Sequence, residues 1–190
     1  MTDKRIIALL PGSRKQEIKT KLPIMLYVVE NFPEYQFVIA GAPSQDHSFY
    51  ETFISNERVK FITGDTYNLL NNSHAGLVTS GTATLETALF KVPQVVCYKS
   101  SAISYQIAKR IIKVKYISLV NLIEEKKVVT ELIQNDLTKK QLMEELQPLL
   151  SGAKREAMMN SYDKLINHCG GVGASKKTAE LMLEHLKNQN

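Results

Sequence analysis

The sequence predicts an α/β protein with a doubly wound parallel sheet. Short apolar stretches of strand length alternate with helical stretches, the pattern typical of strands covered by helices on both faces. Several apolar runs are continuous, as expected for parallel strands that are buried on both sides. Small-residue turns follow two of these runs, and ligands of such folds bind outside the carboxyl ends of the strands.

The first predicted strand is residues 6–10 (IIALL), which is bounded by Pro11 and Gly12. Ser13 is a candidate N-cap for the next helix, with Gln16 as its capping-box partner. Pro23 marks a boundary or kink in that helix, which is expected to continue to residue 31. Further strands are predicted at residues 36–40, 58–62, 75–78 and 94–98, and helical stretches at residues 46–54, 67–71 and 81–90.

The rest of the chain is predicted to be mostly helical. Residues 101–113 form a basic amphipathic segment with isoleucines on one stripe, and a short strand is expected at residues 116–119. Helices are expected at residues 129–134, 138–150, 153–167 and 175–186. We therefore predict a single domain over residues 1–190, with an α/β core over residues 1–150 and terminal helices over residues 151–190.

Composition limits the class of protein. A chain of 190 residues that is 44% hydrophobic fits one globular domain with a core, or at most two small domains. The two cysteines, Cys97 and Cys169, indicate a reducing compartment and not a disulfide framework. No apolar stretch approaches the ~20 residues of a membrane span, and the start of the sequence has no signal-peptide pattern. The expected location is the cytoplasm.

The net charge of +5 is concentrated in one segment. Residues 87–123 contain no acid, whereas the remainder has 18 bases and 19 acids. Such a patch predicts an anionic partner, whether phosphates, nucleic acid or a lipid surface; a solvated helix face is the alternative. Nucleic acid is disfavoured because interleaved aromatics that stack bases are missing. The bases of the segment are Lys91, Lys99, Lys109, Arg110, Lys113 and Lys115.

Metal-ligand spacing is not found among the histidines or the acidic residues. We therefore expect no tightly held metal and no cofactor.

Residues 80–86 (SGTATLE) are the most informative motif. They join an apolar strand to the start of a helix, where unpaired backbone N–H groups and the helix dipole favour an anion. Glu86 lies one turn into this helix, within reach of the sugar hydroxyls of a nucleotide whose phosphates lie at the turn. The motif therefore indicates a nucleotide site, and plain helix capping is the alternative.

Residues 10–14 (LPGSR) form a second strand-to-helix turn with phosphate chemistry. Gly12 is flexible, Ser13 offers a hydroxyl, and the Arg14 guanidinium can grip a phosphate bidentately. An ordinary turn followed by a surface arginine is the alternative. Because both turns are expected at strand carboxyl ends, they can face the same crevice.

A family resemblance rests on these motifs together with residues 116–123 (YISLVNLI) and 131–134 (ELIQ). Their order and spacing resemble those of lipid-A-disaccharide synthase over residues 6–150, and the chain looks like the C-terminal, nucleotide-binding domain of that family. The resemblance implies a Rossmann-like half of a GT-B fold and an inverting hexosyltransferase of lipid A biosynthesis. The implied donor is UDP-2,3-diacylglucosamine and the implied acceptor is 2,3-diacylglucosamine 1-phosphate. Another GT-B glycosyltransferase or a UDP-N-acetylglucosamine epimerase is the alternative, and a non-catalytic basic α/β binding module is a remote one.

The resemblance also implies residue roles. Ser80, Gly81 and Thr82 would hold the UDP diphosphate, and Glu86 would bind the ribose hydroxyls. Arg14 would stabilise the departing UDP, an electrostatic role. For Asn121, Glu131 and Gln134 the alternatives are, respectively, a turn asparagine, a first-turn helix acid and a surface amide. The remaining residues assigned to the nucleotide or catalytic site are Gly12, Ser13, Asn121, Glu131 and Gln134.

Two expectations concern the surroundings of the domain. The basic segment, with Lys109, Arg110, Lys113 and Lys115, would rest on an anionic lipid surface and place the protein peripherally at the inner membrane. The family has an N-terminal half that binds the acceptor and supplies the base. Because the first predicted strand begins at residue 6, we expect that half to be absent and the chain alone to transfer no sugar.

Overall fold

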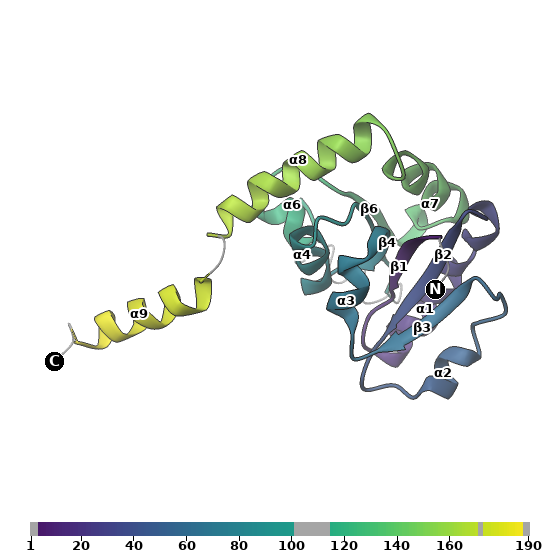
Figure 1. Cartoon of the computed structure of the whole chain (residues 1–190), viewed down its shortest axis with the longest axis horizontal. Helices are drawn as coiled ribbons and strands as arrows, with labels where there is room; N and C mark the ends of the chain where they lie inside the picture. Colours follow the sequence, from purple (N-terminus) through teal and green to yellow (C-terminus); the bar gives the residue numbers. More distant parts are fainter. Residues whose placement is uncertain (1–3, 101–114, 171–172, 188–190) are drawn as a thin grey trace.

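The centre of the molecule is a six-stranded parallel sheet, seen in a computed structural model that describes residues 4–100, 115–170 and 173–187 (Figure 1). The strand order is β3-β2-β1-β4-β5-β6, so the chain reverses direction across the sheet between β1 and β4. The predicted doubly wound α/β fold is confirmed, and its switch point lies at the carboxyl ends of β1 and β4. The strands are β1 (Arg5–Leu10), β2 (Tyr35–Gly41), β3 (Val59–Thr63), β4 (Ser73–Thr79), β5 (Gln94–Tyr98) and β6 (Thr130–Ile133).

Helices cover both faces of the sheet. Leu9 of β1 packs in a cluster with Leu22 of α1, whereas its neighbour Leu10 packs in a second cluster with Leu70 of α3. Successive strand side chains point to opposite faces, which explains why the apolar run is continuous. The helices are α1 (Lys15–Leu26), α2 (His47–Glu51), α3 (Thr66–Asn71), α4 (Thr82–Leu89), α6 (Leu119–Ile123), α7 (Lys139–Leu146), α8 (Ala153–His168) and α9 (Ala174–Lys187), with 3-10 turns η1 (Val29–Asn31), η2 (Gln134–Asp136) and η3 (Gln147–Leu149).

Strand β4 contains an irregularity at its amino end. Ile6 of β1 is paired with Ser73, and the next residue, Ile7, is paired with Ala75. His74 is therefore an extra, bulged residue. Nε2 of His74 lies 2.7 Å from the carbonyl oxygen of Leu150, and its ring stacks on Tyr35 at 5.8 Å between centroids. The bulge therefore ties the sheet to the end of η3.

Two predictions for residues 116–134 are wrong. The segment predicted as a strand at residues 116–119 leads into helix α6, whose N-cap Ser118 accepts the N–H of Asn121 on its hydroxyl. The segment predicted as a helix at residues 129–134 is strand β6 followed by η2. In β6 the exposure alternates, because Thr130 and Leu132 are buried while Glu131 and Ile133 are half-buried. This alternation is characteristic of a strand paired with β5.

The two terminal helices differ in their packing. Met158, Tyr162 and Leu165 of α8 are buried against the body of the molecule. Helix α9 has no buried residue and extends away from the rest in Figure 1. Leu183 of α9, for example, is 58% exposed. Only α8 therefore contributes to the core.

The predicted basic helix at residues 101–113, with Lys109, Arg110 and Lys113, lies outside the described residues. Lys115, the last base of that segment, is described and exposed. Within the described ranges no helix is both long and apolar enough to cross a bilayer.

Candidate functional site

A cleft of about 370 Å³ lies where the turns after β1 and β4 meet. The two strands pair directly, with Leu10 opposite Val78, so both turns emerge side by side at the switch point. We call this space the two-turn cleft. It brings together these predicted site residues: Gly12, Ser13, Arg14, Ser80, Gly81, Thr82 and Glu86.

Each turn contains a glycine with positive φ. Gly12 has φ of +112° and Gly81 has φ of +128°, a region that other residues rarely adopt. A Cβ on Gly12 would lie 2.7 Å from Oε2 of Glu17, whereas a Cβ on Gly81 would meet no atom within 4 Å. The first turn is thus closely packed against α1, and the second leaves open space beside its backbone.

Helix α4 begins at Thr82 beside the cleft, with Gly81 as an N-cap that supplies no side-chain hydrogen bond. The hydroxyl of Thr84 donates to the carbonyl oxygen of Gly81 at 2.8 Å and accepts the N–H of Leu119 at 3.3 Å. The helix start is therefore held from its outer side, and no side chain in the described ranges caps it. Such a start suits an anion, because its N–H groups and dipole point at the ligand.

Ser80 connects the cleft to the segment before α6. Its hydroxyl donates to the carbonyl oxygen of Ile117 at 3.2 Å. The hydroxyl hydrogen of Ser80 is therefore used within the protein, and its oxygen can only accept a hydrogen bond from a ligand.

Arg14 lies at the mouth of the cleft. Its side chain is 84% exposed and pairs with Glu17 at 3.1 Å. Arg14 is also the N-cap of α1, with φ of −89° and ψ of 135°, and no side chain among the described residues caps this helix. The predicted cap by Ser13 is wrong, because the extended backbone of Arg14 delays the first helical residue to Lys15.

Glu131 and Asn121 lie together but line neither the two-turn cleft nor the adjoining pocket that is lined by Lys21 and Tyr98. The Glu131 carboxylate accepts the backbone N–H of Ser118 at 2.9 Å, the Ser118 hydroxyl at 2.6 Å and Nδ2 of Asn121 at 2.9 Å. It also accepts the N–H of Ile117 at 3.1 Å. Glu131 lies on β6 and not in the first turn of a helix. Its carboxylate holds the backbone that leads into α6.

The amide of Asn121 is buried and fully used inside the protein. Its Oδ1 accepts the N–H groups of Val128 and Val129 at 2.7 and 2.9 Å, and its Nδ2 donates to the carbonyl oxygen of Val129 and to Glu131. Gln134 likewise holds Ser100, accepting its N–H at 3.2 Å and donating to its hydroxyl at 3.2 Å. These side chains shape the loops around the cleft.

Sequence reasoning missed Lys21. Its side chain is 2% exposed, and its ammonium donates to Oγ1 of Thr79 and to Oε2 of Glu17, the latter at 3.4 Å. Burial lowers the pKa of Lys21, and the neighbouring Glu17 carboxylate opposes that shift. A signal was present, because residue 21 falls on the same buried helix face as Ile18, Leu22 and Met25, where a lysine is unusual.

Lys21 lies in a second space of about 440 Å³, which adjoins the two-turn cleft and shares Arg14, Glu17, Thr79 and Ser80 with it. We call it the Lys21 pocket. Tyr98 and Lys99, at the carboxyl end of β5, also line it.

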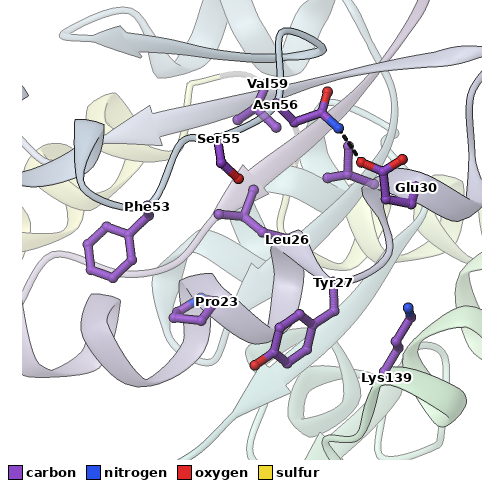
Figure 2. A pocket seen from close by; sticks show the side chains of 10 residues that line it. Pro23, Leu26, Tyr27, Glu30, Phe53, Ser55, Asn56, Val59 and Lys139 are labelled. Atoms are coloured by element: carbon purple, nitrogen blue, oxygen red, sulfur yellow. Dashed lines mark hydrogen bonds between the residues drawn. The ribbon is translucent and has the colours of Figure 1, made fainter.

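A separate cavity of about 350 Å³ lies between the end of α1 and the start of β3 (Figure 2). Pro23, Tyr27 and Phe53 line it, and Nδ2 of Asn56 donates to the Glu30 carboxylate beside it. It lies at the amino end of β3, away from the cleft, and contains no predicted site residue. The described residues also contain no cluster of histidine, cysteine or acidic side chains suited to a metal ion.

A sequence profile of the lipid-A-disaccharide synthetases matches residues 1–184. The chain belongs to this family. The lipid-A-disaccharide synthase of Anaeromyxobacter sp. (strain K) is 36% identical over 185 residues, which cover 93% of this chain and 48% of that protein. The enzyme of Syntrophus aciditrophicus (strain SB) is 36% identical over 196 residues, covering 99% and 51%. This member of the family thus spans about half the length of the curated relatives that it matches.

Solved structures share the fold of this lipid-A-disaccharide synthetase family member at low identity. UDP-GlcNAc 2-epimerase from Neisseria meningitidis, bound to UDP-GlcNAc, has a TM-score of 0.62 and 18% identity, covering 97% of this chain and 46% of that one. The glycosyltransferase VinC in complex with dTDP has a TM-score of 0.60 and 15% identity, covering 95% and 41%. These likenesses concern the fold alone.

Proposed function

We propose that the two-turn cleft binds the diphosphate and ribose of a UDP-sugar, and that the chain is the donor-binding part of a lipid-A-disaccharide synthase. The observation that carries this proposal is the meeting of two glycine turns at the switch point, with the uncapped start of α4 beside them. Family membership supplies the reaction class. The proposed donor is UDP-2,3-diacylglucosamine, and the proposed acceptor is 2,3-diacylglucosamine 1-phosphate.

The proposed roles follow from the position of each group. The backbone N–H groups at Gly81 and Thr82 bind the diphosphate, because Gly81 leaves open space for close approach. Glu86 is half-buried in the cleft wall one turn further along α4, where its carboxylate accepts hydrogen bonds from the ribose hydroxyls. Gly12 and Ser13 form the opposite wall.

The proposed reaction breaks the bond between the anomeric carbon of the sugar and an oxygen of the β-phosphate. The electron pair of that bond leaves with UDP, so negative charge grows at the diphosphate. Arg14 and the start of α4 stabilise this charge, which lowers the barrier only as far as they bind the departing diphosphate better than the intact donor. The acceptor hydroxyl bonds to the opposite face of the carbon, inverting it, and its proton passes to a base that we assign to no described residue.

Glu131, Asn121 and Gln134 are proposed as positioning residues. Glu131 holds the backbone of Ile117, whose carbonyl oxygen accepts the hydroxyl of Ser80. A chain of hydrogen bonds thus runs from β6 to the turn after β4, without any of the three side chains touching the ligand.

The organisation into an α/β core over residues 1–150 with terminal helices over residues 151–190 stays a prediction. Peripheral association with the cytoplasmic face of a membrane is likewise proposed from charge alone, because residues 87–123 contain six bases and no acid.

Calorimetric titration with UDP tests the proposed function, because UDP binding requires only the donor cleft. Replacing Glu86 with Ala removes the ribose acceptor, and we expect affinity to fall about tenfold, the usual scale for a hydrogen bond to a charged group. The matched control is Glu34→Ala, which removes an exposed acid distant from the cleft and should leave affinity unchanged. Equal binding by wild type and Glu86→Ala would remove Glu86 from the site. A folded wild-type chain that binds no UDP would contradict the function.

A further inference from the structure

We propose that Lys21 is a positioning residue of the two-turn cleft, which balances the charge of Glu17 and thereby frees Arg14 to bind the phosphates of the ligand. This inference rests on the proposed function in so far as the ligand is a nucleoside diphosphate. Lys21 lines the adjoining pocket, which shares Arg14, Glu17 and Thr79 with the cleft.

Glu17 lies between two cations. Its Oε1 lies 3.1 Å from Arg14, and its Oε2 lies 3.4 Å from Lys21. The two partners differ sharply, because the Arg14 side chain is 84% exposed and Lys21 is 2% exposed. An exposed ion pair contributes little, so water or an anion can replace Glu17 as the partner of Arg14. The buried partner cannot leave.

Charged and titratable groups of two elements face Lys21. Glu17 and Arg14 come from the α1 side, and Cys97 comes from β5. Burial raises the pKa of the Cys97 thiol to about 12, so it is neutral near pH 7. Among these groups, Glu17 is therefore the negative charge that compensates the Lys21 ammonium, and a buried charge needs such a partner.

Lys21 also links the two turns. The Lys21 ammonium donates to Thr79, which directly precedes the Ser80 turn. Glu17, the other partner of Lys21, lies against the first turn, because a Cβ on Gly12 would come within 2.7 Å of its Oε2. One buried amine therefore bridges the elements that form the opposite walls of the cleft.

These contacts define what happens when an anion enters. Arg14 exchanges Glu17 for a phosphate, and Glu17 keeps its charge balanced by Lys21. Without Lys21, the Glu17 carboxylate would hold Arg14 and repel the phosphate at short range, where charges interact strongly in a poorly solvated site. The consequence is a cleft whose phosphate affinity depends on a lysine in the adjoining Lys21 pocket.

The test measures binding of inorganic pyrophosphate and of UDP by calorimetry, using the full chain. Lys21→Met removes the charge and should weaken both ligands about tenfold, a scale typical of coupled charged groups. Lys19→Met removes the same charge from an exposed position of the same helix and should change neither. In the double variant Lys21→Met with Glu17→Gln, binding should recover to within about threefold of wild type, because the uncompensated carboxylate is gone.

The recovery separates charge balance from a purely structural role. A structural link would be broken equally in the double variant, so absence of recovery would overturn the proposal. Unchanged binding by Lys21→Met would overturn it too. If circular dichroism shows that Lys21→Met does not fold, Lys21→Gln, which keeps a donor for Thr79, takes its place with the same expectations.

The two ligands distinguish this proposal from the proposed function. If wild type binds pyrophosphate but not UDP, the nucleotide assignment fails and the pyrophosphate series alone decides the role of Lys21. If wild type binds both ligands and the Lys21 variants bind them equally well, the Lys21 proposal fails and the function stands. A folded wild type that binds neither ligand overturns both.

Discussion

Single residues determine the shape of the cleft, and Gly12 does so in two ways. Its φ of +112° strains any other residue, and it leaves no room for a side chain beside Glu17. The motif predicted the first property, since glycine is the usual residue at such a turn. The second depends on where α1 packs, which no local pattern contains.

Gly12→Ala should therefore destabilise the protein by about 1–3 kcal/mol and weaken UDP binding about tenfold, because its Cβ displaces the Glu17 carboxylate. Urea denaturation and calorimetry measure the two effects. Gly152→Ala is the matched control, because Gly152 also has positive φ, +84°, but open space around it and a position at the start of α8. It should lose stability and keep its UDP affinity. Equal loss of affinity in both variants would contradict a local effect at Gly12.

The contrast between what a local motif determines and what packing determines also explains which site residues the sequence could predict. Gly12, Arg14 and Ser80 follow strands, and the carboxyl ends of neighbouring parallel strands meet at one edge, so their proximity follows from the fold class. Lys21 lies inside a helix, and its importance comes from burial between α1 and β4. Asn121 was placed with the site by resemblance, whereas its side chain is consumed by hydrogen bonds to its own loop.

At the level of elements, strands β1, β2, β4 and β5 were predictable because each contains a compact apolar run. The edge strand β3 was also predicted, although it contains the exposed Lys60 and only Val59 is buried. Residues 116–134 were not, because β6 is an edge strand with only alternate residues buried. A segment of this kind has no continuous apolar signal. Its identity as a strand is decided by pairing with β5, and α6 depends on Glu131 from that strand.

The contact between β4 and η3 makes stability depend on pH. Burial lowers the pKa of His74 below the ordinary 6.5, with the hydrogen bond to Leu150 opposing the shift and Arg155 and Arg5 adding to it. The unfolded chain therefore binds the proton more readily than the folded one. The stabilisation should be fully present well above pH 6.5, and the free energy of unfolding should fall as the pH drops from 6.5 to 5.5.

Urea denaturation across that pH range checks this expectation. His74→Gln should flatten the dependence, whereas His47→Gln, at an exposed position paired with Glu51, should retain it. An unchanged slope in His74→Gln would assign the dependence to another group. The lowered pKa values of Glu124 and Glu145 act at lower pH, because their ordinary value is 4.5.

At the scale of the whole molecule, the two terminal helices contribute differently to stability. Helix α8 closes one side of the core, with Tyr162 fully buried and its hydroxyl beside Nε2 of Gln94 at 3.3 Å. Helix α9 contributes no buried side chain. Leucines on the two helices therefore have different energetic roles, although the sequence predicts a helix at both places.

Leu165→Ala in α8 should reduce the free energy of unfolding by about 2–5 kcal/mol, because it empties a fully buried position. Leu183→Ala in α9, where the side chain is 58% exposed, should change it by less than about 0.5 kcal/mol. Urea denaturation of the two variants gives the comparison. A large effect at Leu183 would mean that α9 packs on a surface in solution.

The bulge at His74 has a consequence for the opposite end of its strand. One extra residue changes the parity of β4, so every side chain from Ala75 onward faces the side of the sheet that its neighbour would otherwise face. Thr79 is the last residue of that strand, and its hydroxyl meets Lys21 only with this parity. An insertion at the amino-terminal end of β4 thus decides which hydroxyl is presented to Lys21 at the carboxyl-terminal end of that strand.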